Sequence, residues 1–472
     1  MTASPSSTLV ADSLSREFAE FAAGLQYEQL PASAVEGAKK TLLDSIGVTL
    51  AASGAEPAVR PVIDLVREGG GRPESTVLGS GVRASATEAA FANGAMAHSL
   101  NYDDQTPWGQ HSSSSVVPAV LAVAERVGAV SGRDLIAAVA VGQDLFARLR
   151  CNVGWKQDWN LSTVLGSFAA TAAAGRLLRL TPEQLSHAFG IASMQAGGVM
   201  ELVTGLGSQL GGLYGGFPAR AAVTSALLAQ KGTTGHPAVF DGPLGVFAAY
   251  FGGNYDRGAM VADLGVDFKG SYTLYKPWAA IGTAHSHIHA MIDVVTRDDL
   301  QVRDIDEIMV YVGDCHEALC APLPERRAPS TLLDARFSLP FLVSVAAVRR
   351  GMRVADLTAE TLTDPTVLNL AQRIVPVSDP ALDWKLELPH GRIEVVMRDG
   401  RRIVAIGNDV PGSAAAPLTW NDLTTKFADC AAAAAVPPSP RAVCQLQDLI
   451  QNLEALDDVT ILVRLLAGSA DN

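Results

Sequence analysis

The pattern of hydrophobic and polar positions along this chain first changes character at about residue 267. Before that point, apolar residues recur with helical spacing. In the segment 30–53, Val35, Leu42 and Ile46 fall on one helical face, and Pro31 precedes the predicted helix. Later runs are apolar nearly all round, which is typical of helices buried in a large bundle; they span 116–127, 134–149, 163–178 and 219–228.

After residue 267 the pattern becomes mixed. The β-branched run 305–314 predicts a strand, and 392–407 predicts a hairpin that turns at Asp399-Gly400. Between them, 334–351 predicts one helix that starts at Asp334. The chain becomes helical again after residue 408, with an interruption at 436–440. We therefore expect a mainly α protein: a large all-helical bundle with a smaller α+β unit inserted before the last helices.

Composition narrows the range of partners. The chain of 472 residues is 48% hydrophobic and 18% charged, as in ordered globular proteins, and its formal net charge of −13 argues against nucleic acid as a partner. No apolar run approaches the roughly 18 residues that span a bilayer, and the N-terminus lacks the apolar stretch of a signal peptide. The scattered cysteines suggest neither a disulfide framework nor a zinc site. We expect a cytoplasmic protein with no membrane partner.

One segment, 93–125, concentrates polar residues between two apolar, alanine-rich runs. It contains His98, Asn101, Asp103, Asp104 and His111. Burying such groups without partners costs several kcal/mol, so their presence in core-like sequence suggests a functional site. The glycine-rich stretch 205–216 is a weaker candidate for a phosphate cradle, because no strand precedes it and no Lys-Ser/Thr pair follows.

Six segments of this sequence resemble, in order, the signatures of the MmgE/PrpD family: LPASAVEGAKKTLLDSIGVTLAASGAEP, FANGAMAHSLNYDD, HSSSSVVPAVLAVAE, YKPWAAIGTAHSHIHA, DARFSLPF and GSAAAPLTWNDLTTKF. The resemblance runs from about residue 15 to 465. It implies a helical domain formed by 1–265 and 409–472, an α+β lid formed by 266–408, and usually a homodimer. It also implies an enzyme that acts on small di- and tricarboxylates without metal or organic cofactor.

The resemblance also points to site residues, and some of them are altered. The family's His, Asp-aromatic-Asp-Asp and His run reads here as His98, Asn101-Tyr102-Asp103-Asp104 and His111, so an amide replaces the leading carboxylate. Further along, positions that are commonly His, Lys, His, and Cys or His in the family are Asn160, Gly211, Tyr214 and Ile281. Lys276 and His285 are retained.

These observations give candidate roles, each with a structural alternative. Imidazole titrates near neutral pH, so His111 is the candidate for proton transfer, against a histidine that only marks the entry to a helix. Asp103 and Asp104 either orient His111 or cap a helix. His285 is a second catalytic candidate. The candidates for substrate binding are Asn101, Tyr102, Asp104, Asn160, Tyr214 and Lys276.

Each substrate-binding candidate also has an ordinary explanation. A buried tyrosine usually satisfies a backbone carbonyl, and Lys276 could be a solvated surface lysine. Arg220 could replace the missing cation, although a helix-surface arginine explains it equally. A metal site among His285, His287 and His289 is disfavoured, because no third ligand is suitably spaced.

The first functional hypothesis is a cofactor-independent lyase that dehydrates or decarboxylates a small organic acid by proton transfer next to a carboxylate or carbonyl. An isomerase or epimerase would use the same enolate-like intermediate. Because of Gly211 and Ile281, the enzyme could instead serve a biosynthetic step on a less carboxylated substrate than 2-methylcitrate. The third hypothesis is a catalytically inactive homologue that acts as a binding partner.

Overall fold

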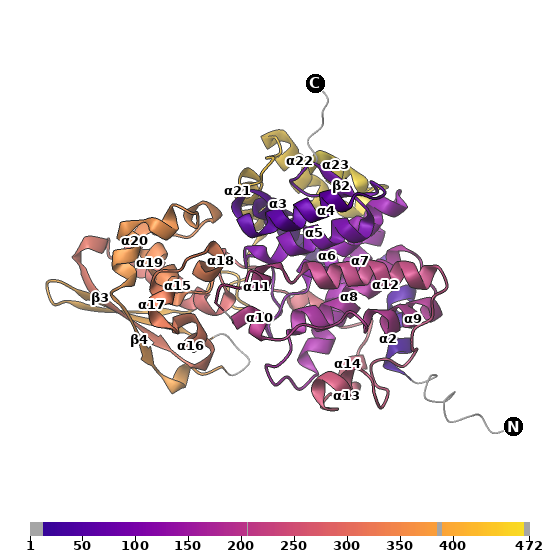
Figure 1. The fold of residues 1–472 in the computed structure, drawn as a ribbon, viewed down its shortest axis with the longest axis horizontal. Coiled ribbons are helices and arrows are strands. Elements are labelled where there is room, and N and C mark those ends of the chain that lie inside the picture. Colours follow the sequence, from indigo (N-terminus) through magenta and orange to yellow (C-terminus); the bar gives the residue numbers. More distant parts are fainter. Residues whose placement is uncertain (1–12, 205, 385–388, 467–472) are drawn as a thin grey trace.

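The structure, a computed structural model, describes residues 13–204, 206–384 and 389–466, and it divides visibly into two parts (Figure 1). One part is made of helices packed around one another. The other contains a small sheet covered by helices. The mainly α architecture with a smaller α+β unit, predicted from the sequence, is confirmed.

The helical part is formed largely by the α-helices that precede residue 262. These are α2 (Leu14–Gly24), α3 (Ala32–Ala55), α4 (Arg60–Gly69), α5 (Ala86–Ser99), α6 (Ser113–Val127), α7 (Gly132–Cys151), α8 (Leu161–Leu177), α9 (Pro182–Ala192) and α12 (Gly216–Gln230), with the shorter α10 (Glu201–Thr204), α11 (Leu210–Leu213), α13 (Val246–Phe251) and α14 (Arg257–Val261). The long helix predicted over 30–53 is α3. The four apolar runs are α6, α7, α8 and α12.

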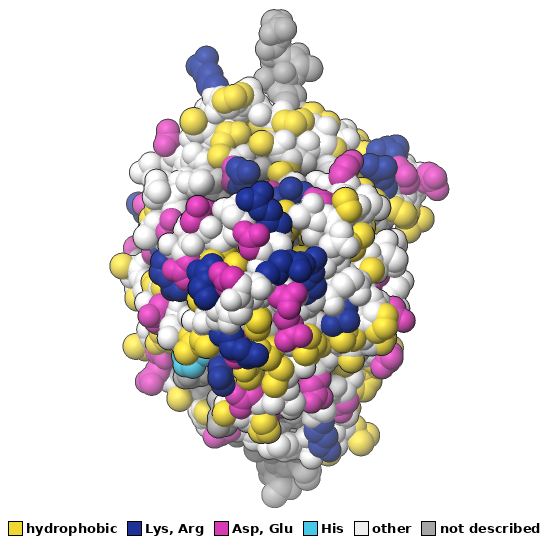
Figure 2. All heavy atoms as spheres, turned by 90° about the vertical axis from the view of Figure 1, so that its left-hand side faces the viewer, with side chains coloured by type: hydrophobic (Ala, Val, Ile, Leu, Met, Phe, Trp, Pro, Cys, Tyr) yellow, Lys and Arg dark blue, Asp and Glu magenta, His cyan; other side chains and the backbone are white. Residues whose placement is uncertain are grey.

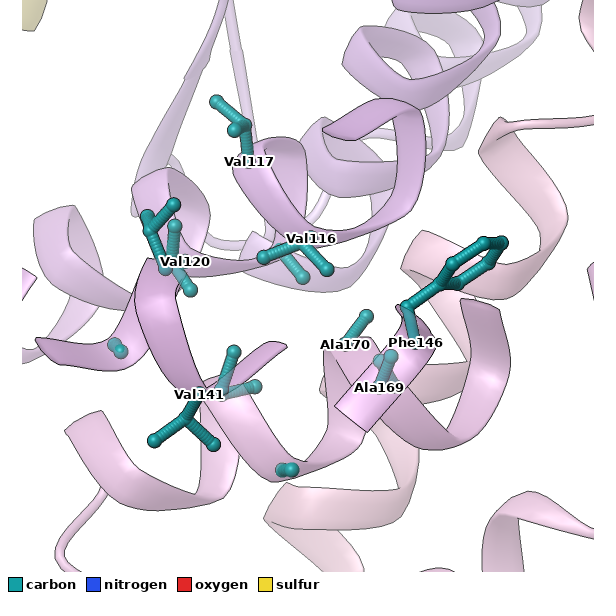
Figure 3. Close-up of a cluster of buried hydrophobic side chains, with 14 of the residues drawn as sticks. Val116, Val117, Val120, Val141, Phe146, Ala169 and Ala170 are labelled. Atoms are coloured by element: carbon teal, nitrogen blue, oxygen red, sulfur yellow. The ribbon is translucent and has the colours of Figure 1, made fainter. Parts of the chain in front are cut away.

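Small and β-branched side chains fill the centre of this bundle. Figure 3 shows Val116 and Val120 of α6 near Val141 of α7 and Ala169 of α8, all buried in one hydrophobic cluster. Alanine and valine allow the helix axes to approach closely, and burial of their apolar surface is the main favourable term in the folding free energy. This rigid core supports the ends of α5, α6 and α8, which carry the polar segment 93–125 and its neighbours.

The C-terminal helices return to the bundle. They are α21 (Trp420–Ala432), α22 (Pro440–Gln451) and α23 (Thr460–Leu466); they lie near the top of the view in Figure 1, where α21 and α22 pack on α3. The buried face of α21 includes Leu423 and Phe427, which join the same core cluster as Leu42 of α3. A buried ion pair, Lys426 Nζ to Asp44 Oδ1 at 2.6 Å, connects the two helices.

The α+β unit is built on a four-stranded sheet of order β4-β3-β5-β6. Its strands are β3 (Ile305–Val312), β4 (Ile374–Ser378), β5 (Gly391–Met397) and β6 (Arg402–Gly407), and its helices are α15 (His285–Arg297), α16 (Asp314–Cys320), α17 (Leu323–Arg327), α18 (Leu332–Arg336), α19 (Leu339–Arg349) and α20 (Pro365–Ala371). β4 runs parallel to β3, whereas β5 pairs antiparallel with both β3 and β6. The strand at 305–314 and the hairpin at 392–407 are therefore confirmed.

Two paired glycines set the position of α15 over this sheet. Gly391 and Gly407 face each other in the register of β5 and β6. A Cβ atom on Gly391 would lie 2.1 Å from the carbonyl carbon of Ser286, and one on Gly407 would lie 1.8 Å from its carbonyl oxygen. Only glycine permits this approach of backbone to backbone, so the glycine pair fixes the start of α15, where His285 lies.

The structure corrects three details of the sequence interpretation. The single helix predicted over 334–351 is two helices, because Ser338 caps α19 and Pro340 occupies its first turn, which excludes a continuous helix. The region before 253 also contains a short hairpin, β1 (Ser75–Val77) with β2 (Val82–Ala84). The strand β4 had no recognisable alternation of polar and apolar residues.

The outer face of the α+β unit has side chains of both charges. Figure 2 shows Lys and Arg side chains interspersed with Asp and Glu over this face. Within the described residues, every helix is too short or too polar to cross a bilayer.

Candidate active site

The polar segment begins where α5 ends. Asn101 adopts a left-handed conformation with φ of 50°, and its N–H donates to the carbonyl of His98 at 2.8 Å. Asparagine tolerates this conformation better than most residues, because its short amide bonds locally. The turn directs the following loop back across the end of α5, so that Asp103 meets His98.

Asp103 is the buried centre of the site. Its side chain is fully buried; Oδ2 accepts a hydrogen bond from His98 Nδ1 at 2.8 Å and lies 3.5 Å from His111 Nδ1. Lys276 Nζ lies 3.8 Å from Oδ1. Burial by itself raises the pKa of Asp103, but its electrostatic interactions with His111, His98 and Lys276 and the hydrogen bond from His98 outweigh burial, and the pKa falls below its ordinary value. Asp103 is therefore a buried carboxylate anion.

His111 is held in one tautomer. Its ring Nδ1 is in hydrogen-bond contact with the backbone carbonyl of Asp104, which can only accept, so Nδ1 carries the proton and Nε2 carries the lone pair. The backbone N–H of His111 donates to Ser162 Oγ at 3.1 Å. Burial lowers the pKa of His111 to about 3, with Asp103 opposing and Lys276 adding to the shift. At neutral pH the ring is neutral, and Lys276 is then the cation beside Asp103.

Asp104 caps a helix, whereas Asp103 does not. Its Oδ1 accepts from the backbone N–H and the hydroxyl of Ser113 at 3.2 and 2.6 Å, and its Oδ2 accepts from Ser112 Oγ at 2.9 Å. These donors belong to the start of α6, so Asp104 caps that helix, whereas Asp103 orients histidines. Burial, together with the nearby Asp103 charge, raises the pKa of Asp104 to about 7.

Two buried lysines hold the backbone of the site in place. Lys276 is only 2% exposed, so the surface interpretation is wrong; its Nζ donates to the carbonyl of Asn101 at 2.9 Å. Lys426 of α21 donates to the carbonyls of Tyr102 and Lys276 at 2.8 and 2.9 Å. The lysine from the C-terminal helix thus links the loop after α5 to the first residues of the α+β unit.

The two tyrosines have different surroundings. The hydroxyl of Tyr102 donates to the carbonyl of Pro277 at 3.1 Å, and the ammonium of Lys426 lies 3.7 Å from the centre of its ring. The ring of Tyr214 lies 4.0 Å from that of His98, centroid to centroid. Tyr102 therefore has a structural function in this geometry, and Tyr214 covers one face of His98.

The two asparagines present unsatisfied amides. Asn160 caps α8, its side-chain oxygen accepting from the N–H of Thr163 at 3.3 Å. The amide nitrogens Nδ2 of Asn101 and of Asn160 are both buried, and neither has a hydrogen-bond partner among the described residues. Buried amide donors without partners are rare in folded proteins, and an incoming oxygen atom would satisfy them.

His285 lies apart from the group around Asp103. Its Nε2 bonds to the carbonyl of Ala280 at 3.1 Å, and its ring lies 5.4 Å from that of Trp278. In the part of the chain that the structure describes, it makes no hydrogen bond or ring contact with His98, Asp103 or His111. Burial lowers the pKa of His285 to about 3, and Lys276 adds to this shift. His285 therefore lies near the lysine, and its catalytic role stays a prediction.

The histidines 285, 287 and 289 do not converge on a common point. His287 bonds to the carbonyl of Tyr311 at 2.8 Å, and His289 stacks on Trp278 with ring centres 6.2 Å apart. A group with suitable ligand spacing is formed instead by His98, Asp103 and His111, whose candidate atoms lie within 4.8 Å of one another. The ammonium of Lys276 beside Asp103 opposes a divalent cation there, so the chemistry of this group favours a hydrogen-bonded proton-transfer site.

The altered positions are also placed. Gly211 lies in α11, where a Cβ atom would be 3.0 Å from the carbonyl oxygen of Leu202. The N–H of Ile281 donates to the carbonyl of Arg336 at 3.1 Å. Arg220 pairs with Glu88 at 2.7 Å and is about half exposed, so it does not replace a cation in the site.

Sequence reasoning missed four contributors to the site. His98 was noted but not placed among the candidates, although its position in the polar segment was the available signal. Asp44 and Lys426 are 382 residues apart in the sequence, and no motif connects them. Only the packing of α21 on α3 brings them together. Ser162 similarly comes from the second residue of α8.

The fold and the site together define an enzyme-like class: a helical bundle with an α+β unit, joined at a buried His-Asp-His-Lys group. The model of the MmgE/PrpD N-terminal domain matches residues 16–257, and that of the MmgE/PrpD C-terminal domain matches residues 278–449. The chain belongs to the MmgE/PrpD family.

Curated relatives cover nearly the whole chain at low identity. A cis-aconitate decarboxylase of Aspergillus terreus (strain NIH 2624 / FGSC A1156) is 27% identical over 95% of this chain and 95% of its own length. The cis-aconitate decarboxylase of Mus musculus is 24% identical over 97% and 94%, and that of Homo sapiens is 25% identical over 97% and 95%. The similarity supports a lyase-type enzyme in broad terms.

Proposed function

We propose that this protein is a cofactor-independent lyase that dehydrates or decarboxylates a small organic acid by proton transfer at the carbon next to a carboxylate or carbonyl. The observation that carries the proposal is the state of His111: a neutral imidazole, fixed by the Asp104 carbonyl so that Nε2 bears the lone pair, beside a buried carboxylate. Its side chain keeps 14% exposure, whereas Asp103 is fully buried. Of the two, His111 is therefore the group that a substrate can reach.

In a dehydration, His111 Nε2 takes the proton from the carbon next to the carboxylate. The electron pair of that C–H bond forms the carbon–carbon double bond, and the leaving hydroxide takes the proton back from the His111 imidazolium and departs as water. In a decarboxylation, the bond to the carboxyl carbon breaks, carbon dioxide leaves, and the remaining electron pair takes up a proton that His111, neutral at rest, relays from water. Asp103 stabilises the imidazolium in either direction, as a buried carboxylate does beside a catalytic histidine.

Negative charge that develops on a substrate oxygen needs oriented donors. We assign this function to the unpartnered amides of Asn101 and Asn160. A well-placed neutral donor contributes on the order of 3 kcal/mol to lowering a barrier of this kind. Lys276 holds the Asn101 carbonyl and the Asp103 charge, so it acts on the same oxygen through the local potential.

Two other functions stay open as alternatives. An epimerase or isomerase would return the proton to the opposite face of the same enolate-like intermediate, and a less carboxylated substrate would suit the uncharged Gly211 and Ile281. The relatives are cis-aconitate decarboxylases, so cis-aconitate is the first compound to assay. We expect it, like 2-methylcitrate, to be a poor substrate, because Asn101, Asn160 and Gly211 stand where the family commonly has charged or titrating residues. A catalytically inactive binding homologue would turn over none of these acids.

The test is proton exchange in deuterated water. The purified protein is incubated with a panel of hydroxy, unsaturated and amino-substituted acids, and NMR follows deuterium at the α-carbon. We expect His111→Asn to slow exchange by about 10²–10⁴-fold, the usual contribution of a positioned acid or base. His390, which is exposed and lies outside this group, gives the matched control His390→Asn. Unchanged exchange in His111→Asn would remove this residue from the mechanism.

The proposal includes a homodimer that needs no metal or organic cofactor. Sedimentation equilibrium tests the first part, with twice the chain mass of 49.3 kDa expected. Exhaustive dialysis against a chelator tests the second, and the exchange rate should be unchanged. A rate restored only by added metal would place an ion on His98, Asp103 and His111 instead.

A further inference from the structure

A small hollow lies between α11 of the bundle and the α17–α18 region of the α+β unit. Its lining includes Ser208 and Gly211 on one side, and Arg326, Leu333 and Asp334 on the other. Its volume is about 10 Å³, room for one water molecule or one carboxylate oxygen. The hollow therefore lies at a contact between the two parts of the molecule and has room for one polar atom.

Arg326 is the cationic side chain in the lining of this hollow, and it is only 4% exposed. Its Nη1 donates to the carbonyl of Phe337 at 3.0 Å and its Nε to that of Ala321 at 3.3 Å. In the described part of the chain its Nη2 has no hydrogen-bond partner, and no carboxylate lies within ion-pair distance of the guanidinium.

Two other buried arginines of the described chain have carboxylate partners, and a third, Arg150, bonds instead to the side-chain oxygen of Gln110. Arg148 pairs with Asp144 at 2.7 Å, and Arg336 pairs with Glu56. A buried guanidinium without an anion is costly to keep, so its presence in a hollow indicates that an anion completes it.

Asp334 does not meet this need. Its Oδ2 accepts from the hydroxyl of Thr331 at 2.7 Å, and its Oδ1 accepts from the N–H of Gly207 at 3.2 Å. Both oxygens are thereby engaged away from Arg326. The potential of Asp334 still helps to keep the guanidinium protonated, although burial acts in the opposite direction on its pKa.

The hollow adjoins the proposed active site through α11. A Cβ atom on Gly212 would lie 2.7 Å from Leu333 Cδ1, in the wall of the hollow, and 3.4 Å from the carbonyl oxygen of Ser99, which follows His98. At its other end α11 leads to Tyr214, whose ring covers His98. The hollow and the catalytic group thus lie on two sides of α11, a short helix about 6 Å long.

The other cations near this position are committed. Lys276 is engaged with Asp103 and the Asn101 carbonyl, and Lys426 with Asp44. A side chain at Gly211 would crowd the carbonyl of Leu202, so the bundle offers no cation at this point. We propose that Arg326, together with the hydroxyl of Ser208, anchors a substrate carboxylate remote from the reacting carbon. The anchoring cation would thus come from the α+β unit.

This inference rests on the proposed function, because it assigns the residue that selects the acid. It requires a carboxylate oxygen to enter the hollow and accept hydrogen bonds from Nη2 of Arg326 and from Ser208. An acid with one carboxylate, held at the reacting end, would gain nothing from Arg326. The residue would therefore discriminate between acids by their distal group.

The test is calorimetric binding of succinate and acetate as probes with and without a second carboxylate. We expect the parent protein to bind succinate at least tenfold more tightly than acetate. Arg326→Gln should abolish this preference, and Arg326→Lys, which keeps the charge but loses the fork, should retain part of it. Arg349, which pairs with Asp364 at 2.9 Å on α19, supplies the control Arg349→Gln with an unchanged ratio.

Ser208→Ala protects the test against a folding defect, since this hydroxyl makes no hydrogen bond in the described structure. We expect a loss of about threefold to tenfold in succinate affinity and none for acetate. No preference in the parent, or an unchanged ratio in both Ser208→Ala and Arg326→Lys, would mean that the hollow holds only a water. Deuterium exchange separates this failure from that of the proposed function: it depends on His111, whereas succinate binding needs no reaction.

Discussion

At the scale of single residues, the site is defined by what burial does to two neighbouring carboxyl groups. Asp103 has basic groups around it and stays ionised, whereas Asp104 has serine hydroxyls and a backbone N–H. Adjacent identical side chains thus acquire different protonation behaviour from their surroundings. Asp103 supplies a negative charge beside the histidines, and Asp104 caps the start of α6.

Asp104→Asn should reveal this difference in stability. A carboxyl group whose pKa rises from 3.8 to about 7 on folding stabilises the folded state fully below pH 3.8, and the contribution is lost as pH rises through 7. The variant lacks this titration. We therefore expect its free energy of unfolding, relative to the parent, to increase by about 2 kcal/mol between pH 5 and pH 8.

Urea denaturation at both pH values measures this effect. His111 titrates in the opposite sense, because its lowered pKa destabilises the folded state as pH falls below 6.5. That contribution is common to parent and variant and cancels in the difference. A difference independent of pH would mean that Asp104 stays ionised throughout this range.

The lowered pKa of His111 also predicts how the rate of exchange depends on pH. With its pKa lowered to about 3, the neutral base persists through the range in which an ordinary histidine becomes protonated. We expect no acid limb near pH 6.5 attributable to this group in the rate of α-carbon exchange at saturating substrate. A limb at that pH that disappears in His111→Asn would show that the imidazole titrates normally.

At the scale of secondary-structure elements, the site depends on close helix crossings. α5 and α12 meet at glycines: a Cβ atom on Gly94 would lie 2.6 Å from the carbonyl oxygen of Gly215 and 2.9 Å from Cα of Gly216. This contact sets the distance between the end of α5, with His98, and the segment that carries Tyr214. The approach is possible because neither backbone carries a side chain there.

Gly94→Ala should therefore separate the two helices. Because the obstructing atoms are backbone, we expect a loss of about 1–3 kcal/mol in the free energy of unfolding. Gly24→Ala at the end of α2 is the control: nothing lies within 4 Å of its added Cβ atom, so stability should change little. Equal effects of the two substitutions in urea denaturation would contradict the importance of the crossing.

At the scale of the whole molecule, a buried ion pair joins the two parts. Arg336 of α18 binds Glu56 at the end of α3, with side chains only 1% and 4% exposed. The carbonyl of the same arginine accepts from Ile281, so the pair also locates the segment after Lys276. The boundaries 1–265, 266–408 and 409–472 stay predictions, and this pair lies across the first of them.

Arg336→Met should leave Glu56 buried without a partner. We expect a loss of about 3–5 kcal/mol in the free energy of unfolding, most of which returns in the double variant with Glu56→Leu. The exposed pair Arg297–Asp293, with side chains 53% and 49% exposed, gives the control Arg297→Met, which should leave the free energy of unfolding nearly unchanged. Additive effects of the two buried substitutions would argue against a coupled pair.

The sequence by itself determined the fold class, the long helices and the hairpin at 392–407, because hydrophobic periodicity and turn residues are local signals. It also located the polar segment 93–125, since titratable residues in apolar surroundings stand out along the chain. It did not reveal the break between α18 and α19 at Phe337-Ser338. An apolar run that contains one serine and one proline still has the residue pattern of a single helix.

Only the tertiary structure decided how the polar residues divide their functions. Which aspartate caps a helix, which nitrogen of His111 is free, and which lysine reaches Asp103 depend on neighbours from distant segments. Lys426 and Arg326 have no signal in their own surroundings, because burial of a charge is a property of the assembled packing. The polar segment was therefore readable from the sequence, whereas the partners that give it a protonation state were not.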